Sequence, residues 1–344
     1  MDNWILYESI GALDEELLAR SEYRLIGRRK RRLSRRFVKT LIAVAVAAGL
    51  LLTAEAGGTI SNLFAPLFGY AQSDLIDSVG RPIGVSVSAD GYTLTADAVV
   101  GDSHRVVIVY TLRRDDEQPI EGALRFDGWD FHREAGVLWL FDAMLNGGGS
   151  GGLGAPEPVE GDPSSIRFYE EVEWRGLSLF PRYHSVQFYD LVRLPDEEGG
   201  EETLIAEGPW KLDFTLRHRS ETRKIRTPQT TVTSALGYQF RFNKVEVSSF
   251  GVYIRGKLLN PPEPDMDDDE LTQEKTNELA LEKIAISVRR KDGTVSELPN
   301  GGLGLSGSDD GKPWAFRLSR EFEAPVPLDE IQAVIVGGEE IPIE

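Results

Sequence analysis

Apolar and polar positions alternate along much of the chain beyond residue 80, which is the pattern of half-buried β-strands. Residues 83–88 (IGVSVS) and 92–100 (YTLTADAVV) alternate on either side of a hairpin-type turn at 89–91 (ADG). Residues 105–112 (RVVIVYTL) are more continuously apolar, so we expect this third strand to lie in the centre of its sheet. Three strands joined by tight turns predict an antiparallel sandwich.

The same pattern continues to the end of the chain and predicts a mainly β protein. A charged stretch at 219–227, followed by Pro228, is typical of a domain boundary. One helix is predicted at 270–283. We therefore expect two β-sandwich-like (Ig-like) domains, residues 72–226 and 228–344. Further strands are predicted at 137–141, 166–174, 186–192 and 210–216 in the first domain, and at 238–247, 252–258, 284–288, 316–318 and 331–336 in the second.

A helical period occurs only near the N-terminus and at the predicted helix of the second domain. Leu6, Ile10, Leu13 and Leu17 recur at spacings that place them on one face of a helix. A segment this short cannot bury a core of its own. The face therefore indicates either an amphipathic helix lying on the inner membrane surface or a docking helix for a cytoplasmic partner.

An apolar run without a single charge extends from residue 40 to 54. Counted as 37–56 it reaches 20 residues, or about 30 Å at about 1.5 Å per residue, which suffices for a transmembrane helix. The sequence thus predicts a cytoplasmic arm at 1–36, a transmembrane helix at 37–56 and a tether at 57–71.

Two alternatives compete with a retained membrane span. Ala54-Glu55-Ala56 fits the small-x-small pattern that precedes signal-peptide cleavage, although the region ahead of the apolar run is far longer than a normal positive segment. Residues 34–39 (SRRFVK) also approach the twin-arginine export pattern, but lack the residue expected between the Arg pair and Phe37. A cleaved signal would release the body of the protein from the membrane.

Charge is divided unevenly along the chain. Residues 1–39 hold 10 Lys/Arg and 6 Asp/Glu, a balance of +4, whereas the remainder holds 28 and 50, a balance of −22. Basic residues beside an apolar run predict that the N-terminus lies in the cytoplasm and the acidic body outside the cell. We therefore expect a single-pass protein of the cell membrane. The acidic body would repel phosphate backbones, so no nucleic-acid partner is expected. The topology-setting block comprises Arg28, Arg29, Lys30, Arg31, Arg32, Arg35, Arg36 and Lys39.

The chain contains no cysteine, which excludes disulfides, thiolate metal sites, cysteine nucleophiles and a lipoprotein anchor. Residues 149–154 and 302–307 match GxGxxG, but neither runs into a helix that could hold a pyrophosphate, and both are predicted to be flexible loops. The acidic run at 265–270 lacks the Gly and Glu positions of a calcium loop.

The four histidines show no metal-binding spacing. His184 and His218 lie near arginines, which suggests exposed surface; the other two are His104 and His132. No catalytic motif is found. We therefore expect no enzyme, no cofactor and no metal.

Several segments carry a resemblance to a known family. The run 10–18 (IGALDEELL), the basic block and the single span resemble a group of Gram-positive membrane proteins with a short Ile-Gly-x-Ile/Leu-Asp segment before one helix. The exported part resembles the family catalogued as domain of unknown function 4179. The resemblance implies an anti-sigma-factor-like regulator of an envelope stress response. The matching segments are 88–95 (SADGYTLT), 107–112 (VIVYTL), the glycine-rich 147–154, 208–214 (GPWKLDF) and the ending 328–342.

The leading hypothesis is a membrane-anchored sensing or regulatory protein, whose inner helix binds a sigma factor or another cytoplasmic regulator and whose exported domains bind an unknown cell-surface ligand. The alternative is an extracellular binding module, anchored or secreted, without a signalling role. An exported hydrolase would need two carboxylates about 5–10 Å apart in an open cleft. The ligand, the regulator, the oligomeric state and the fate of Ala54-Glu55-Ala56 are not specified by the sequence.

Overall fold

The fold is that of a computed structural model, in which every described residue belongs to one structural unit, residues 45–344. Among the described residues no helix is long and apolar enough to cross a bilayer. The predicted span at 37–56 and the arm before it lie outside these residues. The described residues are 60–131, 149–174, 182–195, 200–216, 222–225, 231–234, 237–260, 284–299, 303–306 and 314–343.

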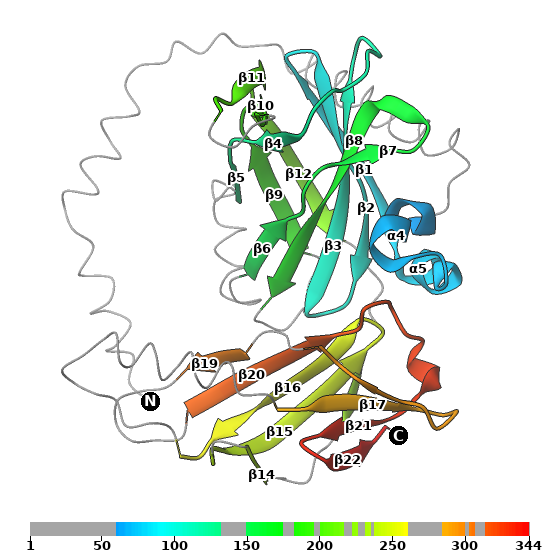
Figure 1. The fold of residues 1–344 in the computed structure, drawn as a ribbon. Helices are drawn as coiled ribbons and strands as arrows, with labels where there is room; N and C mark the ends of the chain where they lie inside the picture. The colour runs from blue at the N-terminus through cyan, green and yellow to red at the C-terminus, as the bar shows by residue number, and fades with distance from the viewer. Residues whose placement is uncertain are drawn as a thin grey trace, which may run out of the picture. The chain divides into compact units, whose positions relative to one another are not determined.

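The first β region is built on a six-stranded antiparallel sheet (Figure 1). Its strands lie in the spatial order β1-β2-β3-β8-β6, and β7 pairs with β8. The strands are β1 (Arg81–Ala89), β2 (Tyr92–Gly101), β3 (Arg105–Arg114), β6 (Gly149–Leu153), β7 (Glu157–Val159) and β8 (Asp162–Trp174).

Strand β3 lies between β2 and β8, as its continuous apolar sequence predicts. Both of its faces are covered, because successive side chains of a strand point to opposite sides. Val106, Ile108 and Tyr110 join the interior of the first region, while Val107 and Val109 pack beneath two helices. A strand buried on both faces cannot show the apolar–polar alternation of its neighbours.

Two three-stranded sheets, together with the large sheet, enclose the interior of the first region. One has the order β11-β10-β4 and the other β12-β9-β5. Trp210 of β12 is fully buried, and its Nε1 donates to the carbonyl oxygen of Tyr92, 3.2 Å away, which ties β12 to β2. The strands are β4 (Leu124–Phe126), β5 (Trp129–Phe131), β9 (Arg182–Phe188), β10 (Leu191–Arg193), β11 (Thr203–Ala206) and β12 (Trp210–Leu216).

Two short helices, α4 (Ile60–Phe68) and α5 (Ser73–Val79), cover the other face of the large sheet (Figure 1). Phe64 and Ile76 are fully buried against it. The carboxylate of Asp77 accepts hydrogen bonds from the backbone N–H and the hydroxyl of Ser61, at 2.7 and 3.1 Å, which joins the two helices. Residues 60–71, assigned to a tether from the sequence, therefore form part of the folded body, because their apolar side chains have a sheet face to cover.

The second β region consists of a six-stranded and a four-stranded antiparallel sheet. The first has the order β13-β15-β16-β20-β19, with β14 paired to β15, and the second has the order β18-β17-β21-β22. A 3-10 turn, Leu328–Glu330, precedes β21. The strands are β13 (Thr222–Ile225), β14 (Thr231–Thr233), β15 (Gln239–Ser248), β16 (Gly251–Leu258), β17 (Ile286–Arg290), β18 (Val295–Glu297), β19 (Leu303–Ser306), β20 (Trp314–Glu321), β21 (Ile331–Val336) and β22 (Glu339–Pro342).

The interior of the second region is formed by aliphatic and aromatic side chains of both sheets, among them Phe240, Phe242 and Phe316. Gly256 of β16 makes room for these rings. A Cβ at this position would lie 2.6 Å from the ring of Phe316 and 2.1 Å from the carbonyl oxygen of Arg241. The glycine therefore reflects close packing inside the sheet.

The prediction of a mainly β chain is confirmed, including the first three strands and the central place of the third. Strand β13 pairs with β15, so Thr222–Ile225 belong to the second region, earlier in the chain than the predicted boundary at 226. The prediction that the two glycine-rich segments are flexible loops was wrong for the residues that the structure describes. Residues 149–153 form β6 and residues 303–306 form β19, because main-chain pairing with β8 and β20 needs no side chain. The predicted strand at 137–141 and helix at 270–283 lie outside the described residues.

Candidate functional site

The turn between β2 and β3 places a set of charged and polar residues against the second β region. Gly101 adopts a φ of +147°, and a Cβ there would lie 2.3 Å from the carbonyl oxygen of Arg105. Oδ1 of Asp102 accepts hydrogen bonds from the backbone N–H groups of His104 and Arg105, at 2.7 and 2.9 Å. The Asp side chain thus closes the turn locally.

The second oxygen of Asp102 reaches the other region. Its Oδ2 accepts a hydrogen bond from the hydroxyl of Ser248 and one from that of Tyr253, the latter at 2.9 Å. Asp102 is only 1% exposed, so its carboxylate is taken out of water and compensated by four donors from both regions. Burial, and then the charge of Asp102, raise the pKa of Tyr253 well above its usual value, which keeps this hydroxyl a donor.

His104 lies on the same turn and stacks on the ring of Tyr253, with centroids 3.9 Å apart. Its Nε2 is 3.3 Å from Oε2 of Glu246, close enough for an electrostatic contact. Lys244 approaches the same oxygen at 2.8 Å. Burial alone would raise the pKa of Glu246, but the interactions with His104 and Lys244 outweigh it and lower this pKa to about 2.

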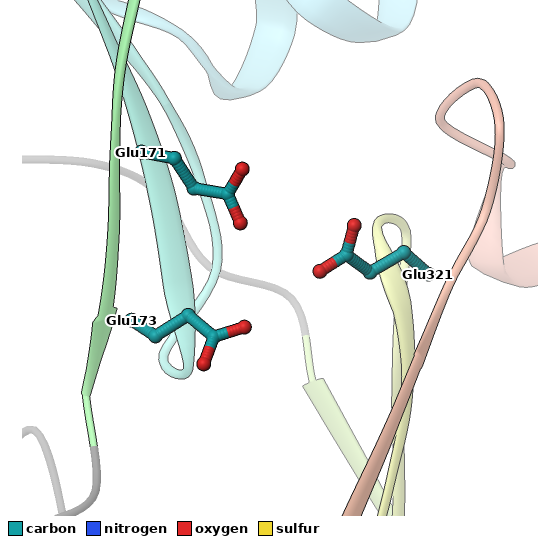
Figure 2. A group of neighbouring side chains, drawn as sticks. All are labelled: Glu171, Glu173 and Glu321. Atoms are coloured by element: carbon teal, nitrogen blue, oxygen red, sulfur yellow. The ribbon is translucent and has the colours of Figure 1, made fainter. Parts of the chain in front are cut away.

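Three glutamates form an acidic cluster at the edge of this junction (Figure 2). Glu171 and Glu173 lie two positions apart on β8, and Glu321 faces them from β20. One carboxylate oxygen from each lies within 4.8 Å of the others, a spacing that could hold a cation. A cation is already present in this place, because Arg105 forms ion pairs with both Glu171 and Glu321.

The Arg105 ion pairs decide the chemistry of the cluster. Burial and the charges of Glu171 and Glu173 raise the pKa of Glu321, and Arg105 offsets part of that rise. The same arginine bridges the two carboxylates that a hydrolase would need as separate acid and nucleophile. Arg105 therefore links Glu171 of β8 to Glu321 of β20, and the ion pairs of the cluster join the two β regions.

A second polar group is buried within the first region. Glu170 of β8 is fully buried, and its Oε2 accepts a hydrogen bond from the hydroxyl of Tyr110 at 2.5 Å. Nε2 of His184, on β9, lies 3.0 Å from the same oxygen. Among the residues that the structure describes, the other oxygen, Oε1, has no hydrogen-bond partner. Burial, followed by the charge of Glu170, raises the pKa of Tyr110 well above its usual value.

The structure tests few of the residues singled out from the sequence. Leu6, Ile10, Leu13, Leu17 and the basic block from Arg28 to Lys39 lie outside the described residues, as do His132 and His218. The prediction that His184 is exposed was wrong, because it is 5% exposed and packs on Phe214. The neighbouring Tyr183 faces solvent instead.

The junction residues were not predicted, but part of their signal is in the sequence. Asp102 follows a glycine at the end of an alternating strand, and His104 and Arg105 follow directly. The residues that they contact, Ser248 and Tyr253, are 146 and 151 positions away. Such contacts become visible only when the fold is known.

The fold and the junction define a mainly β protein of two antiparallel regions joined through buried polar contacts. No protein-family model matches the chain, and no curated protein matches it. Among solved structures it is similar to the crystal structure of the conserved domain protein from Bacillus anthracis, with 14% sequence identity and a TM-score of 0.43. The match covers 75% of this chain and 76% of that chain, and at this TM-score it supports no further argument.

Proposed function

We propose that the protein is a single-pass, membrane-anchored sensing protein of the anti-sigma-factor-like type, without catalytic activity. Its two β regions, which we take to be immunoglobulin-like sandwiches, lie outside the cell and bind a surface ligand. The inner helix face of Leu6, Ile10, Leu13 and Leu17 binds a cytoplasmic sigma factor or another regulator. The observation that carries the proposal is the basic block directly before an uncharged run of 15 residues, followed by an acidic body.

Contacts between the β regions support a sensing role. A sensor needs coupling between the part that binds a ligand and the part that leads to the membrane. Helix α4 begins four residues after the predicted span, and its Phe68 ring contacts Phe250 of the second region, with centroids 6.3 Å apart. The Phe68–Phe250 contact and the contacts of Asp102 and Arg105 connect the two regions. Through them, a rearrangement of the second region could be transmitted to α4, the helix nearest the predicted membrane span.

Co-purification with the full chain tests the regulatory role. The full-length protein is isolated from membranes in mild detergent, and the proteins bound to it are identified. A variant with Ile10→Asp and Leu17→Asp should lose the bound regulator, because it places two charges on the apolar face. A matched variant with Ala12→Asp and Ala19→Asp, on the opposite side of the predicted helix, should retain it. Equal recovery with both variants contradicts the proposal.

The second candidate function is an extracellular binding module without a signalling role, and Ala54-Glu55-Ala56 favours it. Cleavage there would detach the inner arm from the β regions. N-terminal sequencing of the mature protein distinguishes the two candidates. A mature start at Gly57 would establish the secreted module and eliminate the regulator, whereas an intact N-terminus supports the anchored sensor.

A further inference from the structure

The helical pair α4–α5 leaves apolar side chains in solvent at its far end. Leu67 is 41% exposed and Tyr70 is 68% exposed, although Phe64 of the same helix is fully buried. The exposed pair lies where the chain leaves α4 and turns towards α5, together with Pro66 and Ala71. Leu67 and Tyr70 differ from the other exposed apolar side chains in their position, because they follow the predicted span by 11 and 14 residues.

The segment that forms this surface is itself free of charge. No charged residue occurs from position 56 to 73, a run of 18 residues in a body whose net charge is otherwise strongly negative. The first charged side chain is that of Asp74 in α5. An uncharged segment can approach an anionic or zwitterionic headgroup layer that would repel the acidic remainder of the body.

The length of chain before α4 limits where this surface can lie. The predicted span ends at residue 56 and α4 begins at Ile60, so the two are separated by at most about 14 Å of extended chain. The headgroup layer of one leaflet is itself about 5–8 Å thick. Helix α4 must therefore start in or beside the headgroups of the outer leaflet.

The helical pair is also held rigidly on the first β region. Asp77 binds Ser61 at the start of α4, and the hydroxyl of Tyr169 in β8 donates to the carbonyl oxygen of Leu63 at 3.0 Å. A rigid attachment means that Leu67 and Tyr70 keep a fixed orientation with respect to β8. Tyrosine and leucine side chains are also those that favour the interface between water and lipid.

We propose that the surface formed by Pro66 and Leu67 at the end of α4 and by Tyr70 and Ala71 in the turn that follows lies in the headgroup region of the outer leaflet and fixes the orientation of the first β region on the bilayer. The partner is the lipid surface itself. This inference rests on the proposed membrane anchor and deepens it, because it adds a second point of attachment to the bilayer.

The absence of cysteine allows a direct test in the full chain. Leu67→Cys and Tyr70→Cys are each labelled with an environment-sensitive fluorophore and reconstituted in phosphatidylcholine vesicles with or without nitroxide-labelled lipid. Ala71→Cys provides an independent probe of the same surface. Leu204→Cys and Val295→Cys, at positions 51% and 49% exposed on other elements, are the controls. Loss of fluorescence is expected at positions 67, 70 and 71, and none at the controls.

The outcomes separate this inference from the anchor. Vesicle flotation of the full chain tests the anchor first. If the protein floats but the labels at 67, 70 and 71 are quenched no more than the controls, the surface contact is refuted and the anchor stands. A blue-shifted emission without quenching would place a protein on this surface, such as a second copy, and also refutes the contact. If the chain does not float, the anchor and the contact both fail.

Discussion

The interior of the second β region is filled with aliphatic and aromatic side chains, whereas the first region buries Glu170 and His184 among its aromatic rings. Buried polar side chains also occur in the second region: Glu246 and Ser248 are directed to the junction, where they meet His104 and Asp102, and Arg320 of β20 is 3% exposed. The first region thus carries a buried carboxylate inside its own core, whereas the buried carboxylate of the second region, that of Glu246, is directed to its neighbour.

This difference has an energetic consequence. An apolar core is stabilised roughly in proportion to the apolar area removed from water. When one of its side chains is truncated, the loss is the transfer free energy of the removed atoms and the cost of the cavity left behind. A buried carboxylate must be compensated by hydrogen bonds, and loss of one member leaves the others uncompensated. We therefore expect the two regions to respond to substitution by different mechanisms, and four predictions test this, from the largest effect to the smallest.

The largest effect is expected from Phe242→Ala in the core of the second region. The ring is fully buried and lies 6.0 Å from the ring of Phe316. Its removal should cost about 3–5 kcal/mol through lost transfer energy and a cavity. Hydrogen exchange of the full chain, resolved by peptide, should show loss of protection in β15 and β16 while β3 and β8 stay protected. Equal loss in both regions would mean that they unfold as one unit.

Glu170→Ala tests the polar interior of the first region. It deprives the Tyr110 hydroxyl and His184 of a shared acceptor, and we expect a loss of about 3 kcal/mol. Protection should fall in β3, β8 and β9, and not in β16. Glu157→Ala, an exposed acid on β7 of the same region, is the control and should change stability by less than about 0.5 kcal/mol. A loss for Glu170→Ala as small as that of the control would contradict the role of the buried carboxylate.

The position of Glu170 carries a signal in the sequence itself. Alternation in the predicted strand at 166–174 places Glu170 on the same face as Phe168 and Val172, and an acid on an apolar face is a signal of a buried polar group. Its partners could not be read in the same way, because Tyr110 is 60 positions away. Side-chain alternation is a local property, and the pairing of β8 with β3 is not.

The glycine-rich strand β6 and the folded state of residues 60–71 could not be predicted from the sequence for a related reason. β6 reads GSGGL and carries no side-chain pattern, so only its main-chain pairing with β8 makes it a strand. Residues 60–71 read as a tether because the sheet face that Phe64 covers is formed later in the chain. The sequence specified which strands alternate, but the surfaces that cover one another depend on the assembled sheets.

Asp102→Ala tests the junction, where the two regions meet. The variant removes the acceptor for Ser248 and Tyr253 and for the turn itself, so we expect a loss of about 2 kcal/mol. Urea denaturation of the full chain in detergent should then separate into two transitions, because the regions lose a shared contact. Ser103→Ala, which removes a single 3.3 Å contact to Thr222, should leave the denaturation profile nearly unchanged. A single unchanged transition for Asp102→Ala would show that Arg105 and its glutamates suffice to couple the regions.

The smallest effect is expected at Asp97 of β2, and its sign is opposite. Burial raises the pKa of Asp97 to about 6, despite a hydrogen bond from the Thr111 hydroxyl at 2.7 Å. Because the folded pKa lies above the unfolded value of 3.8, the charged form costs stability fully above pH 6, partly between pH 6 and 3.8, and not at all below. The shift would correspond to about 3 kcal/mol at most, and since the side chain keeps some contact with water we expect about 1 kcal/mol.

Asp97→Asn should therefore stabilise the chain at pH 8 and be neutral at pH 3.5 in urea titrations of the full protein, whereas the exposed Asp116→Asn should not gain stability at pH 8. A gain that persists at pH 3.5 would have to come from packing rather than from charge, and would show that the Asp97 charge does not cost the first region stability.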